Sequence, residues 1–542
     1  MSESVQTTRI RGRGGLTLPA SVADRRFPLA VGSVTLAAAV FLLHQLLAWP
    51  PHEDETLALF VGRYPLDQLF QVVLEERGGA PLHFLFAWAV AQLGFGLEGL
   101  RLVSAALAVA SLPVVAALGA RLAGRREALA ATVIVAASWT FLFHGVYGRM
   151  YSLFLCTSAL SYLLLLRALE SGGRRAWALW VLAILATVGT HPYGAIVLAT
   201  QAVFVVLCRR DRLRPAARAF AAVAVLGTPF WLTDLVLAGR FEVGVGGGGE
   251  RLGGPLPVFV YLWHVLGDFT TGWWPLLALV TGLGALGLRI LPRQAALLTA
   301  AVVVVPTLAF LAARLGSATS PETRHLIFVL PFAALAVAAG IVRLGRLAPL
   351  ALAALVVAQV AWAWQKTPPL FEWEPDARQA ARAAASAYLA ATSRPDDVLF
   401  GFEPLYLSAW ERNHDFPLAV LPRADANLAL STLLELGRPL GRGVWILDAS
   451  EPNNAAPALE IEILQPRPES AFEVRRFAPF LVIRTKQPTQ TPTRYLERAG
   501  SAILVGKSLW IGDADVNLLT IERAARALRG YGAARSLSTS SR

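Results

Sequence analysis

Long apolar runs dominate the first two thirds of the chain. They cover residues 27–49, 81–95, 100–122, 128–143, 151–169, 177–190, 193–207, 220–238, 273–291, 295–313, 326–342 and 347–364. About 20 apolar residues in a helix cross a bilayer, and most of these runs approach or reach that length. The pattern therefore predicts an all-α polytopic membrane bundle of about 11 to 13 spans, over residues 27–365.

Arginine-rich loops alternate with arginine-poor loops between these runs. The arginine-rich loops are 121–126, 174–175, 209–218, 289–293 and 343–346. The positive-inside rule places them in the cytoplasm together with the basic N-terminus, residues 1–26. The polar loop 50–80 then lies outside. Inside and outside loops then alternate consistently along the whole chain if the run 81–95 is interfacial or re-entrant rather than a full span. The pattern predicts a multi-pass protein of the plasma membrane.

The composition changes after residue 365, where Pro, Asp, Glu and Arg become frequent. A helix-like run covers residues 377–392, and strand-like runs cover 398–402, 418–421, 444–447 and 480–484. These runs predict a small extracytoplasmic α/β domain over residues 366–490. A C-terminal tail, 491–542, follows, in which residues 499–510 fit either a strand or an amphipathic helix.

The overall charge does not point to nucleic acid. Lys+Arg number 49 against 37 Asp+Glu, and only 16% of residues are charged. The basic residues lie in loops and form no stripe with interleaved aromatic residues, so a nucleic-acid partner is not expected. The partner that the composition does require is the lipid bilayer. Cys156 and Cys208 lie in apolar runs and suggest neither a disulfide nor a metal site.

The first outer loop contains four consecutive titratable residues, His52 to Glu55. Asp54 and Glu55 are adjacent and point in different directions, so one suits a general base while the other binds a cation or a sugar hydroxyl. The alternative is a solvated cap on an amphipathic helix. The two readings stay open at this point.

Other polar residues lie at the predicted outer ends of the spans. The candidates for binding a phosphate or another part of a substrate are Arg149, Tyr151, His191, Tyr193, Arg324 and His325. Arginine is suited to phosphate because its planar fork donates two parallel hydrogen bonds. The alternatives are snorkelling arginines in an aromatic belt and, at Pro192, a simple helix kink.

The order of these features resembles the polyprenyl-phosphate-sugar-dependent glycosyltransferases of the GT-C fold. The residues that carry the resemblance are Asp54-Glu55, the helix start 81–84, Arg101-Leu-Val-Ser104, Arg121-Leu-Ala-Gly124, Arg149-Met-Tyr151, His191-Pro-Tyr193, the stretch 324–331 and the C-terminal soluble domain. The resemblance covers residues 27–450. The most similar branch is the dolichyl-phosphate-mannose protein mannosyltransferase and aminoarabinose-transferase group.

The resemblance implies transfer of a sugar, with inversion, from a polyprenyl-phosphate donor to an extracytoplasmic glycan, lipid or protein. It implies that Asp54 is the catalytic carboxylate, supported by Glu55, and that Arg324 and His325 contact the donor phosphate. A divalent metal on the two carboxylates is compatible with the family but not required by it. Two residues depart from the family's pattern: His325 stands where Tyr is common, and Gly148, directly before Arg149, differs from the residue that is usual there.

A transporter or flippase of lipid-linked sugar is the main alternative. It predicts inverted repeats and charges at mid-membrane depth, whereas the polar residues here gather at one face. A membrane-anchored scaffold is a third reading, and it would not need the Asp54-Glu55 loop. The sequence identifies neither the sugar nor the acceptor.

Overall fold

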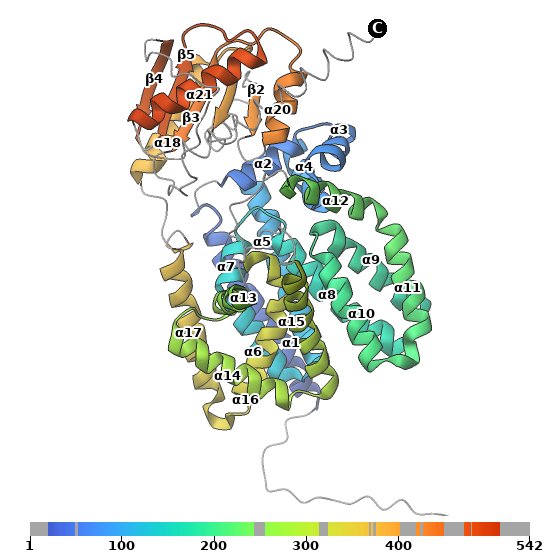
Figure 1. The fold of residues 1–542 in the computed structure, drawn as a ribbon. Helices are drawn as coiled ribbons and strands as arrows, with labels where there is room; N and C mark the ends of the chain where they lie inside the picture. Colours follow the sequence, from blue (N-terminus) through green and yellow to red (C-terminus); the bar gives the residue numbers. More distant parts are fainter. Residues whose placement is uncertain are drawn as a thin grey trace, which may run out of the picture.

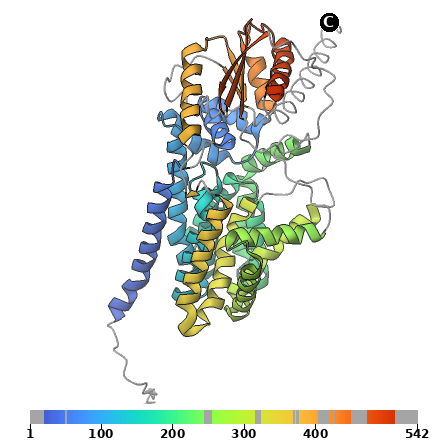
Figure 2. The same ribbon diagram turned by 90° about the vertical axis from the view of Figure 1, so that its left-hand side faces the viewer.

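The computed structural model describes residues 20–48, 52–242, 255–313, 323–367, 370–371, 376–401, 419–422, 426–448, 471–478 and 480–509. A helical bundle carries a small α/β domain at one end, and the helices α2, α3 and α4 lie between the two (Figures 1 and 2). The N-terminal helix α1 (Ala20–His44) runs along the side of the bundle, with its first residues at the end opposite the α/β domain (Figure 2). The predicted helical bundle with a small C-terminal sheet is confirmed.

The bundle is made of apolar helices, several of them broken. The further helices are α5 (Leu97–Leu122), α6 (Arg125–Ala137), α7 (Trp139–Gly145), α8 (Tyr151–Ser171), α9 (Arg174–Thr190), α10 (Gly194–Cys208), α11 (Leu213–Leu226), α12 (Thr228–Glu242), α13 (Pro255–Phe269), α14 (Trp274–Ile290), α15 (Arg293–Ala313), η3 (Thr323–Val329), α16 (Leu330–Val342) and α17 (Ala348–Lys366), with short turns η2 (Arg210–Arg212) and η4 (Gly345–Leu347). Bends separate α6 from α7 by 58° and α13 from α14 by 90°.

Within the described residues, five helices are long and apolar enough to cross a membrane, or up to eight when each bent pair counts as one span. The expected 11 to 13 spans exceed this number because runs such as 193–207 form helices shorter than a full span. The run 81–95 forms α4 (Pro81–Gln92), which has 12 residues. At 1.5 Å per residue it is about 18 Å long, too short to cross the roughly 30 Å hydrocarbon core.

Two glycines allow α14 and α16 to touch through their backbones. A Cβ atom at Gly287 would lie 1.8 Å from the carbonyl oxygen of Ala336, and one at Gly340 would lie 2.2 Å from that of Leu283. Helices in lipid associate mainly through close van der Waals packing, since water expulsion does not drive them together. This reciprocal pair of glycines therefore allows α14 and α16 to pack closely against each other.

The C-terminal domain is a five-stranded mixed sheet in the order β2-β1-β3-β5-β4. Its elements are α18 (Asp376–Thr392), β1 (Val398–Gly401), β2 (Ala419–Pro422), α20 (Ala426–Glu435), β3 (Gly443–Asp448), β4 (Phe472–Phe477), β5 (Phe480–Thr485) and α21 (Pro492–Leu509). Strands β2, β1 and β3 are parallel, and β5 and β4 are antiparallel. The helix and four strands that the sequence predicts are present, within two residues.

The expected boundary of this domain at residue 490 is wrong. Helix α21 lies inside the expected tail, yet its residues Tyr495 and Ile503 are buried in one core with Trp445 and Ile483 of the sheet. The domain therefore extends at least to Leu509. Of the two readings for residues 499–510, the helix is the correct one as far as residue 509, and the rest of the tail lies outside the described residues.

Candidate active site

The loop between α1 and α5 is itself helical and presents the two predicted carboxylates. It contains α2 (Glu53–Gly62), α3 (Leu66–Gln71) and η1 (Val72–Arg77) before α4. His52 caps α2: its Nδ1 accepts the Asp54 N–H at 3.2 Å, and Glu55 Oε2 accepts the His52 N–H at 3.1 Å. This reciprocal capping box satisfies two backbone N–H groups at the start of the helix, and it fixes the beginning of α2 at Glu53.

Glu55 is fully buried, and protein donors hold both of its carboxylate oxygens. Arg101 of α5 donates from Nε to Oε1 at 2.9 Å and from Nη2 to Oε2 at 2.7 Å. The backbone N–H of Gly148 donates to Oε1 at 2.7 Å. Arg101 also donates to the Leu46 carbonyl at 3.2 Å, so one ion pair joins α2, the end of α1, α5 and the turn before α8. Glu55 thus holds the loop in place.

Asp54, in contrast, points into a partly open site between two arginines. Its side chain is 24% exposed, and its Oδ2 lies 3.9 Å from Arg149 Nε and 3.7 Å from Arg324 Nη2. The Tyr147 hydroxyl donates to the same oxygen at 3.3 Å. Arg149 is also tied to the loop, because its Nη1 donates to the Asp54 carbonyl at 3.0 Å. A carboxylate and two guanidinium groups therefore share one site.

The remaining predicted side chains form a cluster of rings beside these arginines. Arg324 lies 5.3 Å above the ring of Tyr151. The His325 ring is 6.0 Å from Tyr151 and 5.1 Å from His191, and the rings of His191 and Tyr193 are 5.2 Å apart. Hence all eight predicted residues meet in one region, although they come from α2, α8, η3, the α7–α8 turn and the α9–α10 break.

Burial sets the protonation of the site residues that lie outside the spans. Burial, followed by the charges of Arg149 and Arg324, lowers the pKa of His191 to about 3, so this imidazole is neutral at neutral pH. Burial and then the charge of Asp54 raise the pKa of Tyr147, which keeps its hydroxyl proton available to Asp54. Burial also raises the pKa of Tyr193. For Arg149 burial lowers the pKa, but Asp54 and two tyrosines outweigh it, so the net shift is upward.

Several site residues were not among the sequence candidates. Arg101 is a charged residue inside an apolar run, which is by itself a signal of function or of a buried partner. Tyr147 lies two residues before Arg149 but carries no charge to mark it. Asp268 of α13 and Lys366 of α17 form an ion pair close to this region, and Lys366 Nζ lies 3.6 Å above the Trp139 ring. The pair is 98 residues apart in sequence, so periodicity does not reveal it.

The predicted pair of metal ligands does not fit a shared metal ion. Both oxygens of Glu55 already accept N–H donors, which leaves Asp54 alone to bind a cation between two guanidinium groups. Divalent cations in proteins are usually held by several oxygen or nitrogen ligands. No group of three or more His, Cys, Asp or Glu residues within the described ranges is arranged to hold one.

Comparisons with known proteins agree with this architecture. Residues 78–232 match a family model described as dolichyl-phosphate-mannose-protein mannosyltransferase. The fold is similar to ArnT from Cupriavidus metallidurans bound to undecaprenyl phosphate (TM-score 0.58, 14% identity, 84% of this chain and 97% of that chain). ArnT in the apo state gives a TM-score of 0.58 at 15% identity, over 85% and 98% of the two chains.

The oligosaccharyltransferase of Archaeoglobus fulgidus is less similar, with a TM-score of 0.48 at 13% identity over 77% of this chain and 68% of that chain. No curated protein sequence is significantly similar to this one. The chain therefore has the GT-C membrane fold that the sequence pattern predicts, and it is similar over residues 78–232 to a mannosyltransferase family.

Proposed function

We propose that this protein is a membrane glycosyltransferase that moves a sugar from a polyprenyl-phosphate donor to an extracytoplasmic acceptor. One observation carries the proposal: a partly exposed carboxylate, Asp54, lies within 4 Å of two guanidinium groups in a fold shared with ArnT. The site combines a proton acceptor with cations suited to a lipid phosphate. A pure transporter has no need of a general base at this place.

The proposed reaction is a single displacement. The acceptor hydroxyl or amine attacks the anomeric carbon while Asp54 accepts its proton. A bond from the anomeric carbon to the acceptor forms, the bond to the phosphate oxygen breaks, and the configuration inverts. Arg149 and Arg324 stabilise the charge that develops on the leaving polyprenyl phosphate. Tyr147 orients Asp54, and Glu55 with Arg101 holds α2 in position.

The sidedness of the site is part of this proposal. The arginine-rich loops predict that the N-terminus, and with it the first residues of α1, lies on the cytoplasmic side. The loop that contains α2, α3 and α4 follows the other end of α1 and lies at the opposite end of the bundle (Figure 2). The Asp54 site and the α/β domain then face away from the cytoplasm. A reporter fused after Arg126 should give a cytoplasmic signal, and one fused after Leu509 an external signal.

The test is sugar transfer by purified protein from a panel of polyprenyl-phosphate sugars, with envelope membranes as the source of acceptor. Wild-type protein should consume one donor and release polyprenyl phosphate, and the new glycosidic bond should have the opposite anomeric configuration. Donor that moves between leaflets of a proteoliposome without release of polyprenyl phosphate would instead support a flippase. Retained configuration would contradict the single displacement.

A further inference from the structure

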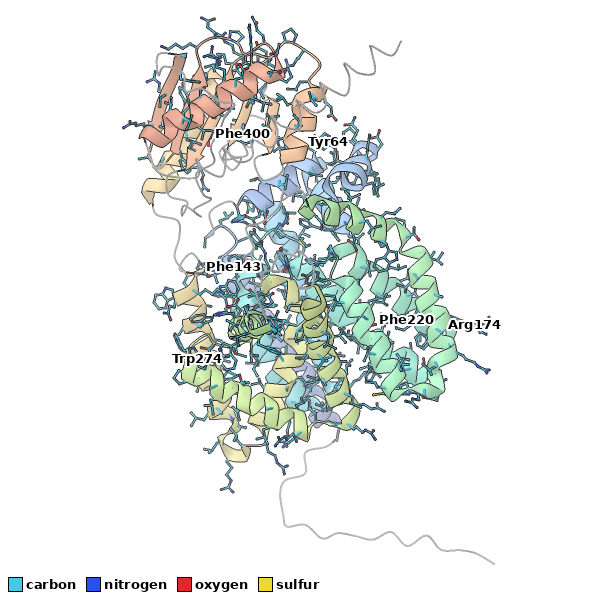
Figure 3. The ribbon with its side chains drawn as sticks, in the orientation of Figure 1. Tyr64, Phe143, Arg174, Phe220, Trp274 and Phe400 are labelled. Carbon is cyan, nitrogen blue, oxygen red and sulfur yellow. The ribbon has the colours of Figure 1, made fainter. Side chains whose placement is uncertain are left out.

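The hydroxyl of Tyr147 lies between two hydrogen-bond acceptors. Its oxygen is 3.3 Å from Asp54 Oδ2 and 3.0 Å from His52 Nδ1. The rings of His52 and Tyr147 meet edge to face, with centroids 5.4 Å apart and 82° between the planes. The Tyr147 ring is also 5.4 Å from that of Phe143, which Figure 3 labels at the end of the bundle next to the α/β domain. His52, the N-cap residue of α2, therefore also contacts the Asp54 site through Tyr147.

The hydrogen bonds of His52 define which of its ring nitrogens carries the proton. The Asp54 N–H donates to His52 Nδ1 at 3.2 Å, so Nδ1 is the unprotonated nitrogen and Nε2 carries the proton. Nδ1 is then an acceptor for the Tyr147 hydroxyl as well. A phenol has a single proton to donate. The Tyr147 hydroxyl can therefore donate to Asp54 or to His52, but not fully to both at once.

The charge of Asp54 decides between the two acceptors. Hydrogen bonds to an ionised partner are roughly twice as strong as those between neutral groups, so an ionised Asp54 attracts the Tyr147 hydroxyl more strongly than a neutral imidazole does. Once Asp54 has accepted a proton, its oxygens lose this advantage. The neutral Nδ1 of His52 is then the better acceptor, because an imidazole nitrogen is more basic than an oxygen of a carboxylic acid.

Burial makes the second acceptor important. Tyr147 is only 3% exposed. Burial, followed by the charge of Asp54, raises the pKa of Tyr147, so the hydroxyl keeps its proton at neutral pH. A buried donor that loses its acceptor is costly, since little water reaches it to replace the lost hydrogen bond. With His52 beside it, the hydroxyl keeps a good acceptor in both protonation states of Asp54.

We propose that His52 is a positioning residue for sugar transfer, whose Nδ1 accepts the Tyr147 hydroxyl as Asp54 takes the proton of the attacking substrate. The inference rests on the proposed glycosyltransferase function and deepens it. The O–H or N–H bond of the sugar acceptor breaks and its proton moves to Asp54, while Tyr147 and His52 each keep their own proton. Only the Tyr147 O–H rotates, from Asp54 to His52. The rotation stabilises neutral Asp54, and with it the transition state in which the carboxylate loses its charge.

Two substitutions separate this role of His52 from its capping of α2. Asn and Ser are both good N-cap residues, so His52→Asn and His52→Ser should melt at the same temperature. Oδ1 of Asn is as many bonds from the backbone as Nδ1 of His and can accept from Tyr147, whereas the Ser oxygen is one bond closer to the backbone and falls short. The single-turnover rate of transfer should therefore fall roughly tenfold in His52→Ser and stay within about threefold of wild type in His52→Asn.

A double-mutant cycle shows whether His52 acts through Tyr147. Tyr147→Phe removes the hydroxyl and keeps the ring, so adding His52→Ser to it should change the rate by less than about twofold. Equal rates for His52→Ser and His52→Asn would overturn the proposal. A loss in His52→Ser that persists in full beside Tyr147→Phe would overturn it too, since His52 would then act without the hydroxyl.

A measurement without turnover tests the same hydrogen bond. Solid-state NMR of the full-length protein in lipid bilayers, with ¹⁵N-labelled histidine, gives the chemical shift of His52 Nδ1, assigned by its absence in His52→Asn. Asp54→Asn carries a neutral side chain in place of the carboxylate, so the Tyr147 hydroxyl should turn to His52 and move the Nδ1 signal upfield. Addition of Tyr147→Phe should abolish this shift. An Nδ1 signal that is the same in wild type and Asp54→Asn would overturn the proposal.

The two proposals fail in different ways. Donor consumption that depends on Asp54, together with equal rates for His52→Ser and His52→Asn, would refute the role of His52 and leave the glycosyltransferase function intact. An upfield Nδ1 shift in Asp54→Asn, without consumption of any donor by the wild type, would refute the reaction and leave the exchange of the Tyr147 hydroxyl between Asp54 and His52.

Discussion

Arg101→Met should be among the most damaging substitutions in the chain, although Arg101 is not expected to touch either substrate. Arg101 and Glu55 are 1% and 0% exposed and share two hydrogen bonds of 2.9 and 2.7 Å. Without the guanidinium, Glu55 keeps two neutral donors, the N–H groups of His52 and Gly148. Breaking one partner of a buried ion pair costs about 3–5 kcal/mol, because the other charge stays buried and uncompensated.

The same helix supplies a matched control. Arg121 lies at the other end of α5 and pairs with Glu170, but the two side chains are 34% and 57% exposed. An exposed pair of this kind contributes at most about 1 kcal/mol, so Arg121→Met should be nearly neutral. The assay is reversible unfolding in mixed detergent micelles, with sugar transfer measured on the folded fraction.

A double-mutant cycle with Glu55→Gln tests the reasoning. Removal of both charges should cost at least about 2 kcal/mol less than the sum of the single substitutions, since neither charge is then left alone. Transfer by the folded fraction of Arg101→Met should also fall, because Glu55 aligns the loop that presents Asp54. Additive losses, or a loss for Arg101→Met no larger than that for Arg121→Met, would refute the account of this ion pair.

Three further predictions follow from single contacts. His191 has a pKa of about 3 in the folded protein and an ordinary value of 6.5 in the unfolded chain, so protonation in acid favours the unfolded state. Between pH 6 and 4, the free energy of unfolding of the wild type should fall by up to about 1.4 kcal/mol per pH unit more than that of His191→Gln. Equal slopes for the two proteins would disprove this. Gly340→Ala should destabilise the bundle by about 1–3 kcal/mol because the new Cβ atom would meet the Leu283 carbonyl. The control Gly282→Ala should not, since a Cβ atom at Gly282 would have no neighbouring atom within 4 Å. Equal melting temperatures for the two variants would contradict the close packing. Chelation with EDTA should leave transfer within about twofold of the untreated rate, since Glu55 is not available as a second ligand; a loss restored by added metal would show otherwise.

Local patterns account for most of the fold that the sequence predicts. Apolar runs mark the helices because lipid requires every backbone group to be paired within its own segment. Short continuous apolar runs mark β1, β3 and β5, as expected for strands buried on both faces. Strand β4 (Phe472–Phe477) lacks this pattern, since it is an edge strand with three charged residues, Glu473, Arg475 and Arg476, of which the two arginines are exposed.

The parts of the site that the sequence does not reveal depend on contacts between residues far apart in the chain. The pattern does predict Asp54 and its surrounding cationic and aromatic residues, since polar groups at one end of apolar runs are conspicuous. It does not distinguish Asp54 from Glu55, because the difference between them is Arg101, a partner 46 residues away on another helix. The Asp268–Lys366 ion pair likewise joins two helices that are distant in sequence, with Asp268 close to the 90° bend between α13 and α14.

The most direct test of the central claim is the single-turnover rate of sugar transfer from pre-bound donor, compared between wild type and Asp54→Asn. Asn keeps the size of Asp54 but cannot accept the acceptor proton, so the rate constant should fall at least about a hundredfold while the donor dissociation constant stays within about threefold. A rate unchanged in Asp54→Asn, with donor bound equally well, would contradict the assignment of Asp54 as the catalytic base.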